Sequence, residues 1–112
     1  MSKFVEALDS YKKVLGDLGV SFDAALLEKV TKGVGPAIYR PDAASVAVSD
    51  KEEVLRVKNN FLIKKLGLTD GPNLDKAIAE VADQMKAIKN KPRAVFYFLL
   101  VEKLGQQAYY TK

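Results

Sequence analysis

The residues of this chain best suited to chemistry are basic side chains that could hold a phosphate or a carboxylate. One group has heptad spacing and consists of Lys51, Lys58 and Lys65. In a regular helix these three lysines project along one seam between two apolar stripes. The second group lies closer together in the sequence and consists of Lys86, Lys89, Lys91 and Arg93. Both groups predict a cationic surface for an anionic ligand or partner.

Each group also has a purely structural interpretation, and the sequence leaves both open. Lysine stems can cover apolar surface while their ammonium groups reach water. Lys86 and Lys89 fall at the end of a predicted helix, where the helix dipole favours cations. Arg93 falls in the first turn of the next predicted helix, where a cation is unfavourable. We therefore expect Arg93 to be held by an acidic partner, Asp83 or Glu102, or by an anionic ligand.

Several classes of site are excluded by residue type. The chain contains no His and no Cys, which removes the commonest metal ligands and the commonest general base near neutral pH. The sequence Gly33-Val-Gly35-Pro36 follows a predicted helix and lacks the third glycine of a dinucleotide-binding loop. Ser49 has neither a His partner nor an S-x-x-K motif. We therefore expect no catalytic residue, no metal ligand and no cofactor, and the chain is predicted not to be an enzyme.

The elements that position these side chains are predicted helices, recognised by apolar residues at spacings of three and four. They cover residues 2–18, 23–32, 49–66, the stretch from 73 to a break at 90–92, and 92–104. Asp23 and Asn73 are predicted helix caps, and Pro92 is predicted at the first helical position. Gly19 and Gly67 are predicted to end the first and third helices in a left-handed conformation.

Local sequence signals predict the structure of three further segments. Ser49 and Glu52 have the spacing of a capping box, which predicts that the third helix starts at Ser49. Residues 37–48 are predicted as a short helix from Pro41 to Ser45 followed by a loop, although residues 46–48 could equally be extended. Residues 106–112 are predicted as a loosely held tail, in which Tyr109 and Tyr110 either pack back onto the protein or form a docking segment.

Length and composition agree with one domain built from these helices. The chain has 112 residues, of which 48% are hydrophobic and 29% charged, values typical of a folded globular protein. Residues 92–104 are apolar nearly all round, so this helix is predicted to be buried. We expect a single all-α domain over residues 1–112, a compact bundle of about five helices around the buried C-terminal helix.

The start of the sequence shows no targeting signal. It carries Glu6 and Asp9 and has no apolar core or small-residue cleavage site, so it is not a secretory signal peptide. The longest apolar run, Ala94–Val101, is too short to span a bilayer. We expect a cytoplasmic protein without membrane contact.

Three stretches of the chain, taken together, show a resemblance to a known protein family. They are Gly35-Pro-Ala-Ile-Tyr39, the run Asn60-Phe-Leu-Ile-Lys-Lys-Leu-Gly-Leu68 that follows Glu53 and Arg56, and Arg93 with Phe96-Tyr-Phe-Leu-Leu-Val-Glu-Lys103. In these stretches the chain resembles a small bacterial family of unknown function, domain-of-unknown-function family 2853. The resemblance implies a compact, mainly helical bacterial protein and implies no catalytic residues.

Two functions remain in view. The net charge is +4, and residues 54–69 and 84–101 form two basic blocks without any acid. The leading expectation is a non-enzymatic binding or adaptor domain, whose partner is an unidentified protein or a second copy of the chain. The alternative is weak binding of nucleic acid or another polyanion through the lysine-rich helix faces, although no nucleic-acid recognition motif is present.

Overall fold

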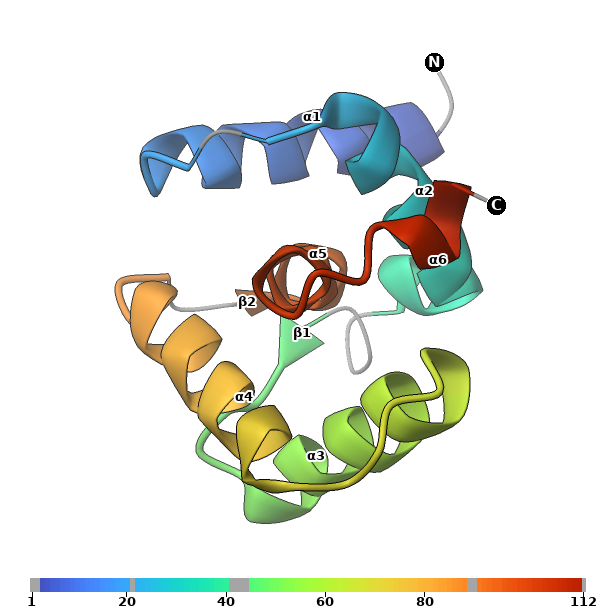
Figure 1. Cartoon of the computed structure of the whole chain (residues 1–112). Coiled ribbons are helices and arrows are strands. Elements are labelled where there is room, and N and C mark those ends of the chain that lie inside the picture. The colour runs from blue at the N-terminus through green and yellow to red at the C-terminus, as the bar shows by residue number, and fades with distance from the viewer. Residues whose placement is uncertain (1–2, 21, 41–44, 89–90, 112) are drawn as a thin grey trace.

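The computed structural model describes residues 3–20, 22–40, 45–88 and 91–111 (Figure 1). The helices and strands follow the chain in the order α1 (Lys3–Asp17), α2 (Ala24–Val34), a 3-10 helix η1 (Gly35–Tyr39), β1 (Ser45–Val46), α3 (Lys51–Arg56), a π-helical segment η2 (Val57–Lys65), α4 (Pro72–Gln84), β2 (Lys91–Pro92), α5 (Arg93–Lys103) and α6 (Ala108–Thr111). The expected all-α fold is confirmed.

Helix α5 lies at the centre of the fold. Figure 1 looks nearly along its axis, with α1 above it, α4 and α3 below it and α2 beside it. Six of its residues are fully buried: Ala94, Val95, Phe96, Phe98, Leu100 and Val101. A helix that is apolar all round needs neighbours on every side, and α1, α2 and α4 all contact α5. The prediction of a buried C-terminal helix is therefore confirmed.

The ends of α1 and α2 follow the sequence signals. Gly19 has a φ of 72°, and the amide of Val20 donates to the carbonyl of Leu15 at 3.0 Å. This is the hydrogen bond of a left-handed helix end, which glycine adopts without a steric penalty. The carboxylate of Asp23 accepts from the amide of Ala25 at 2.9 Å, as predicted for the cap of α2.

The start of α3 differs from the prediction. Asp50, and not Ser49, caps the helix, because its carboxylate accepts from the amide of Glu52 at 2.9 Å. The amide of Asp50 donates to the carbonyl of Ala47 at 3.0 Å. The predicted capping box of Ser49 and Glu52 is therefore wrong. The amide of the capping residue Asp50 is already bonded to Ala47. Glu53, three residues later, is therefore not needed to accept from that amide and points inward.

The helix that starts at Lys51 continues to Leu66 but changes its geometry on the way. From Val57 onward its turns are π-helical, and the amide of Leu66 donates to the carbonyl of Phe61, five residues earlier, at 3.0 Å. A π-helical turn holds more residues than the 3.6 of an α-helix, so residues spaced by seven do not stay on one seam. Gly67 then ends the segment with a φ of 72°, as predicted.

A short antiparallel strand pair was not predicted, although the alternative of an extended stretch at residues 46–48 is confirmed at Val46. Ser45 pairs with Pro92 and Val46 with Lys91, so Ser45 belongs to a strand and not to a short helix. Residues 41–44, where most of that helix was expected, lie outside the described residues. Pro92 is extended, with ψ of 131°, and precedes α5 instead of forming its first residue. The signal was missed because two-residue strands leave no periodic pattern.

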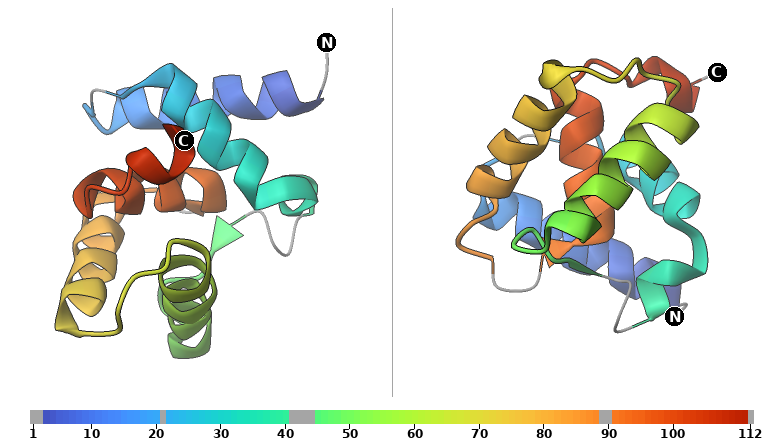
Figure 2. Two further views of the ribbon diagram at one scale, coloured as in Figure 1. Left: turned by 45° about the vertical axis from the view of Figure 1, so that its right-hand side comes forward. Right: turned by 90° about the horizontal axis from the view of Figure 1, so that it is seen from below.

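Two further boundaries differ slightly from prediction. Helix α4 begins at Pro72 after the cap residue Gly71, so Asn73 lies inside the helix and does not cap it. Proline is tolerated at the first helical position because the amide proton that it lacks would have no acceptor within the helix. At the other end of the chain, α6 forms within the predicted tail and lies against α2 (Figure 2). Tyr110 packs against the core there.

Candidate functional site

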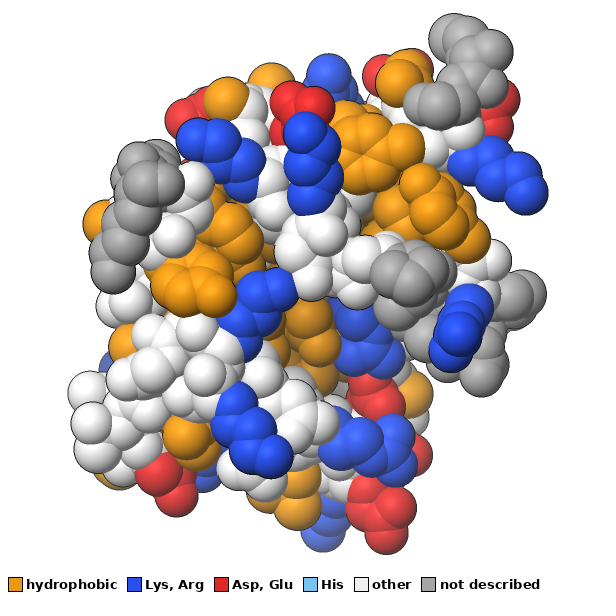
Figure 3. All heavy atoms as spheres, turned by 90° about the vertical axis from the view of Figure 1, so that its right-hand side faces the viewer, with side chains coloured by type: hydrophobic (Ala, Val, Ile, Leu, Met, Phe, Trp, Pro, Cys, Tyr) orange, Lys and Arg blue, Asp and Glu red, His pale blue; other side chains and the backbone are white. Residues whose placement is uncertain are grey.

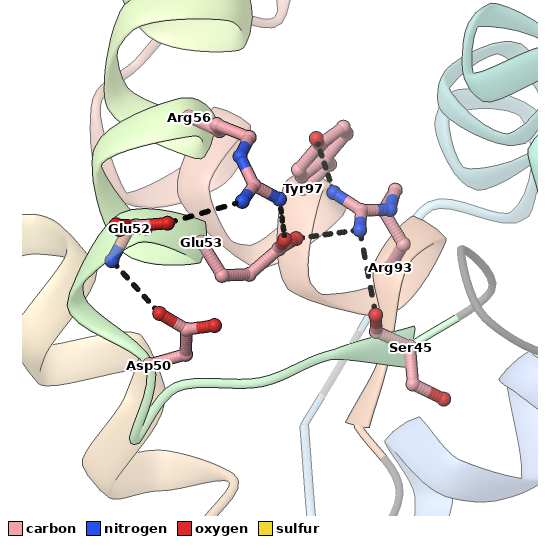
Figure 4. A network of polar contacts seen from close by, with 7 residues as sticks. All are labelled: Ser45, Asp50, Glu52, Glu53, Arg56, Arg93 and Tyr97. Atoms are coloured by element: carbon pink, nitrogen blue, oxygen red, sulfur yellow. Dashed lines mark hydrogen bonds and ion pairs between the residues drawn. The ribbon is translucent and has the colours of Figure 1, made fainter.

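The most enclosed ion pair among the described residues joins α3 to α5. Nη2 of Arg93, on the first residue of α5, lies 2.6 Å from Oε1 of Glu53. Both side chains are largely buried, with 15% and 12% of their surface exposed. Figure 4 shows the Glu53 carboxylate between two guanidinium groups, because Arg56 donates to its other oxygen at 3.0 Å. The pair therefore links two elements 40 residues apart in sequence.

Arg93 makes further contacts that fix its orientation. Its guanidinium donates to the hydroxyl of Tyr97 at 2.9 Å and lies within 3.4 Å of the carbonyl oxygen of Ser45 in β1. Burial lowers the pKa of Arg93, but the hydrogen bonds with Tyr97 and Glu53 outweigh it and raise the pKa. The strand pair brings the start of α5 beside α3. Arg93 is thus held by an acidic partner, as expected, but the partner is Glu53 and not Asp83 or Glu102.

Glu53 is the functional candidate that the sequence reading missed. Its place in the first turn of a helix by itself indicates only an acid that stabilises the positive helix end. It also lies four residues before Val57 and eight before Phe61, both of which are buried. That spacing continues a buried stripe, so the sequence carried a signal that Glu53 faces inward.

Lys65 lies at the end of η2 and reaches the end of α2. Its ammonium donates to the carbonyl of Gly33 at 2.7 Å. A Cβ atom at Gly33 would lie 2.8 Å from this nitrogen, so the absence of a side chain permits the contact. Burial lowers the pKa of Lys65. Among the described residues no carboxylate lies within 4.0 Å of its nitrogen.

Lys65 and Arg93 lie on the same cleft, although they come from different basic blocks of the sequence. The cleft has a volume of about 310 Å³ and is lined by Gly33, Val34, Asn60, Phe61, Lys65, Arg93 and Tyr97. The rings of Phe61 and Tyr97 stack with centroids 4.0 Å apart and 10° between their planes. Figure 3 shows a face on which Lys and Arg side chains surround a recess with hydrophobic side chains in its floor.

The other two lysines of the heptad group do not join this cleft. The ammonium of Lys58 lies 2.8 Å from the carboxylate of Asp70 and 3.0 Å from that of Asp75. Hydrogen bonds with these two carboxylates raise the pKa of Lys58, and the bond with Lys58 lowers the pKa of Asp70. Lys51 lies at the start of α3 on a second groove. The π-helical turns thus distribute the three lysines over different surfaces.

The second basic group is similarly dispersed. Lys86 lies in the turn after α4 and is 3.7 Å from Asp83, with both side chains exposed. Lys91 donates to the carbonyl of Ile88 at 2.9 Å within its own turn. Lys89 lies outside the described residues. Arg93 is therefore the member of this group that the structure places on the cleft.

The second groove lies between α3 and α4 and is largely apolar. It has a volume of about 460 Å³ and is lined by Val48, Lys51, Val54, Leu55, Asp75, Ile78, Ala79 and Ala82. Leu55 is 52% exposed, whereas Leu62 and Leu66, which follow it in the same helical segment, are buried. The amphipathic helix thus leaves Leu55 uncovered beside the groove.

Other classes of site find no support in the part of the chain that the structure describes. No cluster of three acidic side chains there could hold a metal ion. None of the described helices is long and apolar enough to cross a membrane.

The comparison with known proteins agrees with the sequence resemblance. No curated protein matches the chain. The family model described as protein of unknown function (DUF2853) matches residues 9–108, which include both clefts and the Glu53–Arg93 pair. The chain therefore belongs to the DUF2853 family of proteins of unknown function.

Proposed function

We propose that this protein is a non-enzymatic binding domain that self-associates through the groove between α3 and α4. The observation that carries the proposal is the juxtaposition of an apolar concavity with an exposed apolar side chain, Leu55. A single exposed leucine is ordinary on a protein surface. A leucine that projects beside an apolar groove is suited to fill the groove of another molecule.

Charge on the groove favours a second copy as the occupant. Its lining includes one cation, Lys51, and one anion, Asp75. In a two-fold arrangement the same patch meets itself, so Lys51 of one copy can approach Asp75 of the other, a carboxylate that also contacts Lys58 of its own chain. The alanines of α4 that line the groove, Ala79 and Ala82, leave room for the leucine of the partner.

Sedimentation equilibrium of the whole chain tests the self-association. We expect a dimer that resists 0.5 M salt, because apolar contacts are not screened, and that Leu55→Lys converts to a monomer. Val5→Lys is the matched control, because Val5 is also exposed and apolar but lies on α1, on the far side of α5 from α3. A protein that remains monomeric up to roughly 100 µM, a hundred times a micromolar Kd, would refute the proposal.

The alternative proposal, weak binding of nucleic acid or another polyanion, has less support. Such binding needs several cations free to contact successive phosphates. Lys58 pairs with two carboxylates and Lys86 lies near Asp83, while Lys51 and Lys65 lie on two different clefts. Retention on heparin that falls steeply with salt would favour this alternative over self-association.

A further inference from the structure

We propose a second binding site in the cleft between the end of α2, the segment η2 and the start of α5. Its ligand is a small organic anion with one oxyanion group, a carboxylate or a phosphate, attached to a flat apolar part. Lys65 holds the oxyanion and the Phe61–Tyr97 pair contacts the apolar part. This site is separate from the groove between α3 and α4, and it does not depend on self-association.

The first argument is the unbalanced charge of Lys65. The side chain is only partly exposed, and its ammonium contacts a backbone carbonyl, which uses one of three donors. A partly buried cation without a carboxylate partner is costly. Arg93 on the same cleft differs, because Glu53 balances its charge. Within the described residues no carboxylate balances the charge of Lys65, which favours a ligand with one negative group.

The second argument is the shape and lining of the cleft. A volume of about 310 Å³ is at the lower end of the range for small-molecule sites. The lining combines apolar surface from Val34 and the stacked rings with few polar groups, among them the amide of Asn60. Such a combination suits a small ligand whose apolar part lies on the rings and whose charged group is fixed by a few donors.

The third argument is that unusual local geometry builds the cationic end of the cleft. Lys65 reaches its position because Gly33 has no side chain, although glycine inside a helix is less favourable than alanine. Asn60, Phe61 and Lys65 all come from the π-helical segment. Helical π turns are rare overall and are frequent at functional sites. Both features place an ammonium at the cleft at some cost to helix stability.

Titration of the whole chain by 1H–15N NMR tests the site. The probes are benzoate, phenyl phosphate, inorganic phosphate and the neutral analogue benzamide. We expect benzoate or phenyl phosphate to shift the amide of Gly33 and the side-chain amide of Asn60, whereas benzamide leaves them unchanged. The tighter of the two anionic probes identifies the oxyanion. Inorganic phosphate, which lacks an apolar part, should bind more weakly than phenyl phosphate.

Two variants separate the contribution of the Lys65 side chain from the effect of removing one positive charge elsewhere on the protein. Lys65→Gln should weaken binding about 10- to 100-fold, as expected for a hydrogen bond to a charged group. Lys64→Gln is the matched control, because it removes the same charge from the neighbouring exposed residue. If Lys65→Gln does not fold, Gly33→Ala supplies the second test, since the new methyl group displaces the ammonium. Equal weakening by both glutamine variants, equal binding of benzamide, or no shift at Gly33 and Asn60 would overturn the proposal.

Discussion

Removal of the charge from Glu53 should destabilise the protein more than any comparable change of an exposed acid. The variant Glu53→Gln keeps the size of the side chain and one acceptor oxygen. It leaves the guanidinium of Arg93 without its carboxylate, in a position where 15% of the side chain is exposed. The ion pair also joins α3 to α5, so its loss weakens contact between two elements.

The burial of the pair sets the expected magnitude. Breaking a fully buried ion pair costs about 3–5 kcal/mol, whereas an exposed pair contributes about 0–1 kcal/mol. Since both side chains are largely but not fully buried, and glutamine can still accept one hydrogen bond, we expect a loss of about 2–3 kcal/mol. For a domain of this size that corresponds to a decrease in Tm of about 8–12 °C.

Urea denaturation followed by circular dichroism measures this loss. At an m value of about 2 kcal/mol/M, the midpoint should fall by roughly 1 M or more. The matched control is Glu52→Gln, because Glu52 lies 3.7 Å from Arg56 with 84% of its side chain exposed. We expect the control to change stability by less than about 0.5 kcal/mol.

A double variant tests whether the loss arises from an unpaired charge. Glu53→Gln combined with Arg93→Gln removes both charges, so no buried cation is left without a partner. Its loss of stability should therefore be smaller than the sum of the two single losses. Equal effects of Glu53→Gln and Glu52→Gln, or strict additivity of the two glutamine substitutions, would refute this reasoning.

Two other contacts give independent predictions. Asp50→Ala should lower the free energy of unfolding by about 1 kcal/mol through loss of the α3 cap, while Ser49→Ala changes it little. If urea denaturation shows a larger loss for Ser49→Ala than for Asp50→Ala, Ser49 is the cap and the predicted capping box is correct. The pKa of Asp70 is lowered by Lys58, so this contact stabilises the fold fully above the unfolded pKa of about 3.9 and less as pH falls through the folded pKa. In 13C NMR titration Lys58→Met should raise the pKa of Asp70, and an unchanged pKa would contradict the assigned ion pair.

Much of the fold was predictable because local signals are strong at helix ends. Gly19, Asp23 and Gly67 behave as their residue types require, and the apolar segment 94–101 becomes the buried centre. The errors fall where two signals compete within one or two residues. Asp50 replaced Ser49 because both are good caps, and only the contact of Asp50 with Ala47 distinguishes them.

The candidate sites were less predictable, because they depend on which helices meet. The sequence identified Arg93 as a cation in need of a partner but favoured the wrong acids. Glu53 was assigned a role within its own helix, although a carboxylate at that position of the buried stripe required a cation. Pairing between residues 40 positions apart has no local signature.

The amino-acid sequence by itself determined that this protein is a helical domain without histidine or cysteine chemistry and with its cations in two blocks. Tertiary structure decided what those cations do. The strand pair brings Arg93 to Glu53, and the π-helical turns direct Lys58 towards Asp70 and Lys65 towards Gly33. Helix periodicity and capping are local and can be read from neighbouring residues, whereas the balance of a buried charge depends on side chains brought together by packing.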